Sequence, residues 1–500
     1  MLTHDLPDRS EGGADASGGL VRDQGDRVEG PLVLERRREV LGLDAHAPGD
    51  LQDVHLLPEA LCDLLADNGF AVEMGVAHMP SAFVASWGTG RPRIAVMCEY
   101  DATPGETQGP VSYPHAQAGR LSGFTDLHNG IGVASAAAAV AIAKALGTHG
   151  IDGSVVAFGT PAEKLCAGKP MMAQAGLFEG LDAVVAWHPR PYSTVEWDLG
   201  PGIQQGEIFS FIGKSTYSAR PWTGVSAIDA AVLTHVILQF LKDHLPRDDR
   251  STVSEIIARG GEHPTSIPGK TQSWFVLRSA TRDAVERSSA MLSRAVEAAC
   301  LAVGATFERR IFSSTRPWLP NHTIAELSYR NLERAGAPQF SAEAKAFAAE
   351  VLENLDAPAV AEPFDENLTD VRSGVTKDFS GGADDVNEFC WYAPTARIYV
   401  AHGLRTTAIP NWARAAFCRG ATAYPTVLSA ARAVAFSVLE LMIDGKTLAA
   451  AKEEFNRRAD EAGRPGPLIP EGTLPPIDRE FAPAFVREHR LKTLQDDHGE

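Results

Sequence analysis

The stretch Ser154-Val-Val-Ala-Phe-Gly-Thr-Pro-Ala-Glu-Lys164 decides the fold of this chain. It opens with a short apolar run, which is typical of a strand buried on both faces. A helix is predicted near Lys169 to Gln174, and a second buried strand at Ala183-Val-Val-Ala-Trp187. Strands and helices that alternate in this way indicate a parallel α/β layer.

The residues before this stretch extend the same layer. Strands are predicted at 82–87 and 93–98 around a turn at 88–92, and an Ala-rich helix at about 132–146. The loop at 101–124 is long and rich in Gly and Pro, and loops of this length are uncommon unless they are functional. The Ala-rich helix is interrupted by Gly132, Ser135 and Lys144, so we expect it to be too short to span a bilayer.

The middle of the chain has a different pattern. Strands are predicted at 206–212, 254–258, 272–278 and 306–313, and amphipathic helices at 228–241 and 283–303. The order strand–helix–strand–strand–helix–strand is that of a ferredoxin-like unit. We therefore expect a flexible tail at 1–30, one α/β domain at 31–205 and 316–460, an inserted domain at 206–315 and a surface tail at 461–500.

Composition limits the classes of function. The 500 residues include 46 Lys and Arg against 64 Asp and Glu, a net charge of −18. Such an acidic chain is a poor candidate for binding nucleic acid or anionic membranes. The six cysteines form no CxxC pair, which predicts free thiols in a reducing compartment. With no basic, apolar signal segment at its start, we expect the chain to be cytoplasmic.

Side chains that can bind a metal follow the predicted strands. Asp126 and His128 precede the Ala-rich helix, Glu163 follows the strand ending at Phe158, and His188 follows Trp187. In an α/β sheet, the carboxyl ends of parallel strands meet at one rim, where ligands bind. His and carboxylate ligands suit a divalent ion such as Zn²⁺ or Mn²⁺. The alternative is that these histidines are structural, which is the commoner case for a lone His after a strand.

Several motifs together resemble the aminoacylase and carboxypeptidase metallohydrolases of peptidase family M20, nearest to the p-aminobenzoyl-glutamate hydrolase type. They are Cys98-Glu-Tyr-Asp-Ala-Thr-Pro-Gly105, His128-Asn-Gly-Ile-Gly132, Gly159-Thr-Pro-Ala-Glu-Lys164, Trp187-His-Pro189, and the stretches 213–218, 221–229, 258–262 and 382–388. The resemblance implies a metallopeptidase-like α/β catalytic domain with an inserted ferredoxin-like α+β lid and dimerisation domain. It also implies a homodimer or higher homo-oligomer formed through the lid.

The resemblance implies roles for individual residues. Asp126, His128 and His188 would hold one metal, and Glu163 would be the general base. Asp101 would orient His128 from behind the metal ligands.

Three positions depart from the family pattern. Lys164 stands where a second Glu binds a second metal, Asn411 aligns with the final His ligand, and Tyr217 aligns with a lid His. We therefore predict one divalent ion, Mn or Zn, with the Lys164 ammonium in place of the second metal and Tyr217 donating a hydrogen bond. Two alternatives remain: His402 is the ligand and two metals bind, or Lys164 points to solvent and the site is inactive.

For several other side chains the sequence leaves a functional and a structural interpretation open. Arg278 and Arg259 either pair with a substrate carboxylate or form surface ion pairs. Trp222, Trp274 and Phe124 would stack on an aromatic substrate, or belong to the core. Asp385 and Glu388 match acidic family positions, or lie in a solvated loop.

The expected activity is hydrolysis of a C–N bond in a small aromatic or amino-acid-derived carboxylate, with metal-activated water and Glu163 as base. The departures favour an aryl amine aminohydrolase of the 5-nitroanthranilate type, which releases ammonia. The alternatives are an amidohydrolase of N-acyl or N-aroyl amino acids such as p-aminobenzoyl-glutamate, and a non-catalytic small-molecule binding protein. A serine hydrolase is disfavoured because the sequence has no GxSxG motif.

Overall fold

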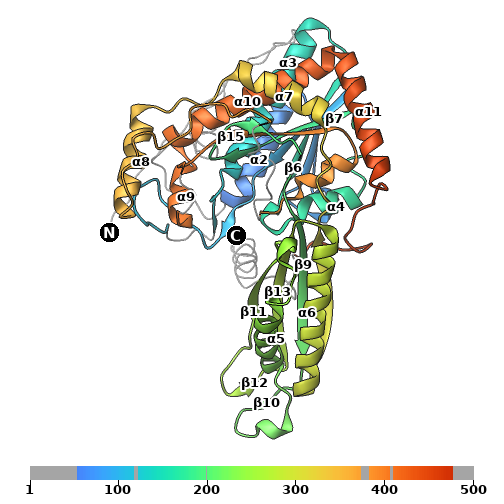
Figure 1. The fold of residues 1–500 in the computed structure, drawn as a ribbon, viewed down its shortest axis with the longest axis vertical. Helices are drawn as coiled ribbons and strands as arrows, with labels where there is room; N and C mark the ends of the chain where they lie inside the picture. The colour runs from blue at the N-terminus through green and yellow to red at the C-terminus, as the bar shows by residue number, and fades with distance from the viewer. Residues whose placement is uncertain (1–52, 118–121, 199, 373–381, 406–408, 477–500) are drawn as a thin grey trace, which may run out of the picture.

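The computed structural model describes residues 53–117, 122–198, 200–372, 382–405 and 409–476, which form two lobes (Figure 1). The larger lobe is built on a seven-stranded sheet of order β1-β2-β6-β3-β7-β15-β8. Its four central strands are parallel, and β2 and β8 run antiparallel to their central neighbours. The strands are β1 Ala71–Met74, β2 Phe83–Trp87, β3 Arg93–Glu99, β6 Ser154–Thr160, β7 Ala183–Arg190, β8 Thr194–Val195 and β15 Thr395–Ala401.

The strands β2 and β3 flank the predicted turn but do not pair with each other. β6 lies between them, antiparallel to β2 and parallel to β3. The turn instead contacts the segment before β6, where a Cβ on Gly88 would lie 2.5 Å from the Gly153 carbonyl oxygen. Glycine is needed there because the two backbones touch and Gly88 has a φ of +76°.

Helices cover both faces of this sheet. On one face lie α3 His128–His149, α7 His322–Ala335 and α10 Gly420–Ile443. On the other face lie α4 Gly168–Gln174 and the short helix η5 Asp385–Trp391, where Phe178 and Phe389 pack on Phe158 of β6. The remaining α-helices described in the larger lobe are α2 Asp53–Asp67, α8 Ala342–Asn354, α9 Asn411–Phe417 and α11 Gly445–Glu461.

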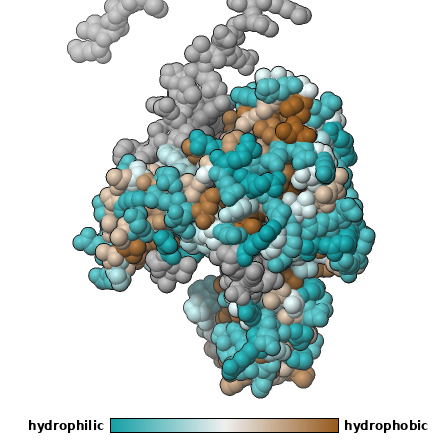
Figure 2. Space-filling model, turned by 45° about the horizontal axis from the view of Figure 1, so that its top comes forward, coloured by the Kyte–Doolittle hydropathy of each residue, from teal (hydrophilic) through white to brown (hydrophobic). Residues whose placement is uncertain are grey.

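The helices α3 and α10 are long and apolar enough to cross a membrane by length and composition alone. Both pack against the central sheet and against each other, and their apolar windows are 61% and 56% buried. Their hydropathy is therefore that of core helices, whose apolar surface is covered by the protein itself. The face of the molecule seen in Figure 2 is mainly hydrophilic.

The smaller lobe, which we call the lid, is a four-stranded antiparallel sheet of order β11-β13-β9-β14 with two helices. A two-stranded ribbon lies at the far end of the lid. The two lobes together confirm the fold class that the sequence predicts, an α/β domain with an inserted α+β domain. β9 is buried on both faces, because it is a central strand of this sheet. The elements are β9 Ile203–Ile212, α5 Ala227–Lys242, β11 Thr252–Arg259, β13 Lys270–Ser279, α6 Arg282–Val303, β14 Thr306–Ser314, and the ribbon strands β10 Thr216–Tyr217 and β12 Ser266–Ile267.

The segment after α11 crosses the junction of the two lobes. Gln174 donates to the Pro470 carbonyl at 2.9 Å, Arg316 donates to the Pro465 carbonyl at 3.0 Å, and Ile469 is buried. Residues 463–476 therefore run along the surface of the two lobes, held there by these contacts, within the predicted surface tail. The rest of that tail and the N-terminal tail at 1–30 lie outside the described residues.

Candidate metal centre and catalytic site

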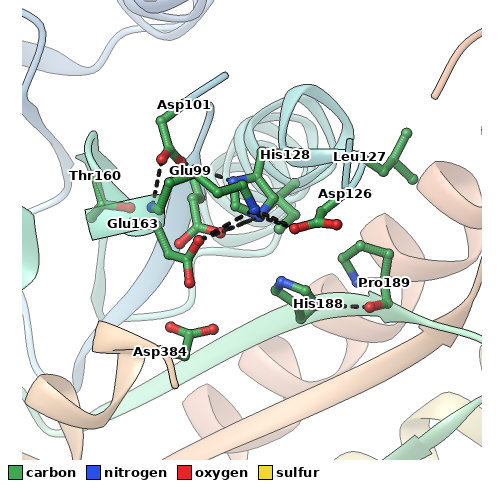
Figure 3. A network of polar contacts seen from close by, with 12 residues as sticks. Glu99, Asp101, Asp126, Leu127, His128, Thr160, Glu163, His188, Pro189 and Asp384 are labelled. Atoms are coloured by element: carbon green, nitrogen blue, oxygen red, sulfur yellow. Dashed lines mark hydrogen bonds and ion pairs between the residues drawn. The ribbon is translucent and has the colours of Figure 1, made fainter. Parts of the chain in front are cut away.

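The candidate site lies at the carboxyl ends of the parallel strands (Figure 3). Glu99 is the last residue of β3, His128 the first of α3, and His188 lies near the end of β7. Glu163 opens a short 3-10 turn after β6. The residues before His128 and Glu163, Leu127 and Ala162, have φ angles of +52° and +62°. Left-handed backbone at non-glycine residues is strained, and such strain concentrates at functional sites.

The two histidines face each other with their ring centroids 5.6 Å apart. His128 Nδ1 lies 2.8 Å from Asp101 Oδ1, and His188 Nδ1 lies 2.7 Å from the Pro189 carbonyl oxygen. Because each of these oxygens accepts a hydrogen bond, each Nδ1 carries a proton. The Nε2 of a neutral ring then presents a lone pair toward the site. The predicted role of Asp101 in orienting His128 agrees with this contact.

Glu99 completes a donor set that the sequence did not indicate. Its carboxylate is fully buried, and Oε2 accepts a hydrogen bond from Lys169 Nζ at 2.6 Å. Oε1 accepts no hydrogen bond from any residue that the structure describes, and it lies 3.4 Å from His128 Nε2. Ligand atoms of Glu99, His128 and His188 all lie within 4.8 Å of one another. Two imidazole nitrogens and an orphaned carboxylate oxygen fit one divalent cation.

The carboxylate of Asp126, which we expected in the donor set, is engaged elsewhere. It forms an ion pair with Lys164 Nζ and lies 3.4 Å from Arg414 Nη1, but 3.9 Å from His128 Nε2. Two cations contact this carboxylate here, so Glu99 is a further candidate ligand and the Asp126–metal contact stays a prediction.

Lys164 points into the site. Its ammonium contacts Asp126, lies 3.2 Å from His128 Nε2, and lies 3.6 Å from Glu163 Oε2. Burial lowers its pKa, but Glu163 and Asp126 outweigh burial and raise the pKa above its usual range, so the group is charged. A positive charge is thus built into the site, which argues against the solvent-facing alternative.

The carboxylate of Glu163 points toward the same space as His188 (Figure 3) and lies 3.7 Å from His128 Nε2. Burial raises the pKa of Glu163 well above its usual range, and the neighbouring carboxylates Asp384 and Glu99 raise it further. A carboxylate with a raised pKa is suited to accept and return a proton.

The two histidines differ in their affinity for protons. Burial, followed by the charges of Arg397 and Arg190, lowers the pKa of His188 well below its usual range, so its ring is neutral. Burial also acts to lower the pKa of His128, but Glu99 and Asp101 raise it to about 9. A cation that binds here must therefore displace a proton from His128.

A cavity of about 430 Å³ opens in front of these residues. Of the residues expected to contact substrate, Arg278 lines this cavity. His402, the alternative to Asn411 as a metal ligand, lines it as well. Asn411 lies at the start of α9 and donates to Glu106 Oε1 at 2.8 Å. Arg259 pairs with Glu262 on the surface of the lid.

The other candidates lie away from the cavity. Tyr217 is 63% exposed at the far end of the lid, and Trp222 is 78% exposed. Trp274 is buried against Phe312, so it belongs to the core. Asp385 and Glu388 are buried ion-pair partners of Lys169 and Arg316, and do not form a solvated loop.

Sequence reasoning missed four charged residues in and around the donor set: Glu99, Lys169, Asp384 and Arg397. Together with Asp385 they form two buried clusters, Lys169 with Glu99 and Asp385, and Arg397 with Asp384. Glu99 and Arg397 each belong to an otherwise apolar strand. A charged residue in such a strand indicates a buried ion pair, because charged side chains are almost never buried without a partner.

Comparison with known proteins agrees with this geometry, although no family model matches the chain. The chain is 27% identical over 429 residues to a component of the p-aminobenzoyl-glutamate hydrolase of Escherichia coli K12, covering 80% of this chain and 88% of that protein. It is 26% identical to the Xaa-Arg dipeptidase of Mus musculus, covering 77% and 79%. The crystal structure of AtUAH in complex with (S)-hydroxyglycine shares the fold, with a TM-score of 0.50, 11% identity and coverage of 82% and 97%.

The fold, the donor set and these similarities define the class of protein: a metal-dependent hydrolase. The chain is similar to p-aminobenzoyl-glutamate hydrolase and to Xaa-Arg dipeptidase, in line with the resemblance to peptidase family M20 that its motifs carry.

Proposed function

We propose that this protein is an amidohydrolase that cleaves the C–N bond of an N-acyl or N-aroyl amino acid. The observation that carries the proposal is the Glu163 carboxylate, which lies beside the metal donor set and lines the cavity. The similarity to the Escherichia coli p-aminobenzoyl-glutamate hydrolase supports this amide substrate over the aryl amine that the sequence departures favoured.

A divalent ion held by Glu99, His128 and His188 would supply a Lewis acid that polarises the substrate and acidifies water. Glu163 is placed to take the proton of the attacking water and to deliver it to the leaving nitrogen. The Lys164 ammonium is placed to stabilise negative charge that develops on the carbonyl oxygen. Asp101 and the Pro189 carbonyl fix the tautomers of the two histidines.

The first test is the metal content of protein purified without chelator, measured by elemental analysis. We expect one divalent ion per chain, and loss of most of it in the variant Glu99→Gln. Two ions would contradict our interpretation of Lys164. No metal, even after reconstitution, would favour the non-catalytic binding protein.

The second test is hydrolysis of N-aroyl amino acids by the metal-loaded enzyme. We expect the variant Glu163→Gln to lose about 10²- to 10⁴-fold in kcat while it keeps its metal. The matched control is Arg259→Gln on the lid surface, which we expect to retain activity. Release of ammonia from a nitroaromatic amine, with no amide hydrolysis, would favour the aryl amine aminohydrolase instead.

A further inference from the structure

Two hydrogen bonds cross from the lid to the turn that carries Glu163. On β9, the Gln204 amide nitrogen donates to the Leu165 carbonyl at 2.7 Å. On β14, the Ser313 hydroxyl donates to the Cys166 carbonyl at 2.6 Å. Both carbonyls lie within three residues of Glu163 along the chain, so the lid contacts the backbone of this turn directly.

The turn needs support from outside itself. Ala162 and Cys166, at its two ends, have left-handed φ angles of +62° and +48°. Residues with side chains keep this conformation only where the surrounding structure fixes it. The catalytic lobe supplies one contact, in which the Lys164 backbone N–H donates to Asp101 Oδ2 at 2.8 Å. The two hydrogen bonds from the lid fix the carbonyl side of the same turn.

A β-bulge in the lid sheet aims the Ser313 hydroxyl at the turn. Ile311 on β14 lies opposite Glu207 on β9. Ser313 lies opposite Gly206, so Phe312 is an extra residue in β14. Opposite residues share one face of a sheet, and successive residues of a strand alternate between the faces. In a regular strand Ile311 and Ser313 would share a face, but the bulge moves Ser313 to the other face. Bulges beside active sites redirect side chains in this way.

Gln204 lies on that same face of the lid. It precedes Gly206 by two positions on β9, and residues two apart in a strand point to one side. Its backbone N–H donates to Thr315 Oγ1 at 3.0 Å, which ties β9 to the residue after β14. Gln204 and Ser313 are both fully buried, and Gln204 also lines the cavity. Two polar side chains from neighbouring strands of the lid thus converge on one turn of the catalytic lobe.

We infer that Ser313 and Gln204 are positioning residues, which act through two backbone carbonyls to hold the Glu163 carboxylate where it can take the proton of the attacking water. This inference rests on the proposed amidohydrolase function and adds a role for the lid of the same chain. The effect is expected to be large, because a catalytic group misplaced by about 1 Å can lower the rate by about 10²-fold. Ser313 is the clearer probe, since Gln204 also lines the cavity.

The first experiment compares hydrolysis of p-aminobenzoyl-glutamate by the unsubstituted enzyme and by Ser313→Ala, both metal-loaded. We expect kcat to fall by about 10- to 100-fold with KM nearly unchanged, because the turn moves while the substrate contacts remain. The control is Ser288→Ala, which removes an equally buried hydroxyl that donates to the Ala284 carbonyl at 3.0 Å inside α6. Its kcat and KM are expected to stay unchanged. Equal effects of the two substitutions on kcat would overturn the inference.

The second experiment asks whether Ser313 acts through Glu163. In the Glu163→Gln background, Ser313→Ala is expected to cause no further loss of the residual kcat, because residues that act as one unit have strongly non-additive effects. A further loss as large as in the unsubstituted enzyme would contradict the inference, since Ser313 would then act by another route.

The third experiment does not depend on activity. Backbone hydrogen exchange of the peptide spanning residues 163–167 is measured by mass spectrometry on the protein as purified. We expect faster exchange in Ser313→Ala and in Gln204→Met than in Ser288→Ala, because methionine is similar in length to glutamine but donates no hydrogen bond. Unchanged exchange in both variants would overturn the inference, and so would faster exchange with unchanged kcat.

These outcomes separate the inference from the function on which it rests. If the metal-loaded, unsubstituted enzyme hydrolyses no N-acyl or N-aroyl amino acid while the exchange results are as expected, the proposed function fails and the lid still holds the turn. If the enzyme is active and the kcat values of Ser313→Ala and Gln204→Met equal that of Ser288→Ala, the function stands and the positioning role is overturned. Gln204→Met carries the test by itself if Ser313→Ala does not fold.

Discussion

Lys169 is fully buried between two carboxylates, with Nζ 2.6 Å from Glu99 and 2.5 Å from Asp385. Burying one charge is costly unless an opposite charge is close. Its ammonium occupies Oε2 of Glu99 and leaves Oε1 free to face the two histidines. Lys169 therefore gives the buried Glu99 carboxylate an ion-pair partner and holds it facing the metal position.

Glu196 provides a residue-scale prediction on pH and stability. Its carboxylate is buried against Tyr399, and burial raises its pKa from 4.5 to about 7. Between pH 4.5 and about pH 7, the Glu196 carboxyl is deprotonated in the unfolded chain but still protonated in the folded chain. The free energy of unfolding therefore falls as the pH rises through this range. The variant Glu196→Gln has no such proton. We expect its stability relative to the unsubstituted protein to rise by about 3 kcal/mol between pH 4 and pH 8, measured by urea unfolding.

Glu454 offers a control of opposite sign. Although burial acts to raise its pKa, hydrogen bonds from the backbone N–H groups of His322 and Thr323 lower it below its usual value. Its stabilisation is present above the unfolded pKa and is lost as pH falls through the folded pKa. Glu454→Gln is therefore expected to lose stability relative to the unsubstituted protein as pH rises. Parallel pH profiles for the two variants would contradict the assignment for Glu196.

At this scale the sequence predicted those site residues whose positions follow from local motifs. Asp101, His128, Glu163 and His188 lie together, as expected. The contacts of Asp126 with Lys164 and Arg414 did not follow from local motifs, because these two residues approach from other elements. Sequence spacing places a residue at the rim but does not fix which partner its side chain finds.

At the scale of elements, the turn that carries Glu163 is packed against the start of α4. A Cβ on Gly168 would lie 1.8 Å from the Pro161 carbonyl oxygen. Because this contact is with the backbone and not with a flexible side chain, the backbone itself would have to shift. We expect Gly168→Ala to destabilise the fold by about 1–3 kcal/mol, measured by thermal unfolding. It should also lower kcat, because the turn that positions Glu163 must move.

Gly147 in α3 is the matched control. A Cβ there would lie 3.6 Å from Trp87, an ordinary contact, within a helix. Gly147→Ala is expected to stabilise the protein by about 0.5–1 kcal/mol, because alanine favours helix. Equal effects of the two substitutions would contradict the packing argument at Gly168.

The elements themselves were largely predictable, because buried strands and amphipathic helices have clear periodicity. α3 begins at His128, earlier than the predicted start at 132, because His128 initiates the helix directly from the left-handed residue Leu127. The pairing of β2 with β6 was not predictable, because strand order depends on contacts between distant segments.

At the scale of the whole molecule, the lid leaves an apolar surface uncovered. We propose that a second copy of the chain binds there, as the family resemblance implies. β11 is an edge strand on which Ile256 is 55% exposed, and on α5 Val236 and Phe240 are 43% and 70% exposed. Exposed apolar residues beside an unpaired strand edge are typical of an association surface.

We expect sedimentation analysis to give twice the mass of one chain, and Phe240→Glu to give single chains. Leu301→Glu on α6 is the control, since Leu301 is 85% exposed on the other lid helix. A single-chain mass for the unsubstituted protein, or dissociation by Leu301→Glu, would contradict the proposal. A dimer would also offer a route by which Tyr217, remote from its own cavity, reaches a substrate.

The insertion of the lid between β7 and β15 has a consequence for synthesis on the ribosome. All three metal donors emerge before the lid, but β15, which pairs with β7, emerges only after it. Until then the nascent chain presents an unpaired, apolar strand edge at the centre of its future sheet, a surface prone to aggregation. Completion of the central sheet must therefore wait until the whole lid and the segment that follows it have been synthesised.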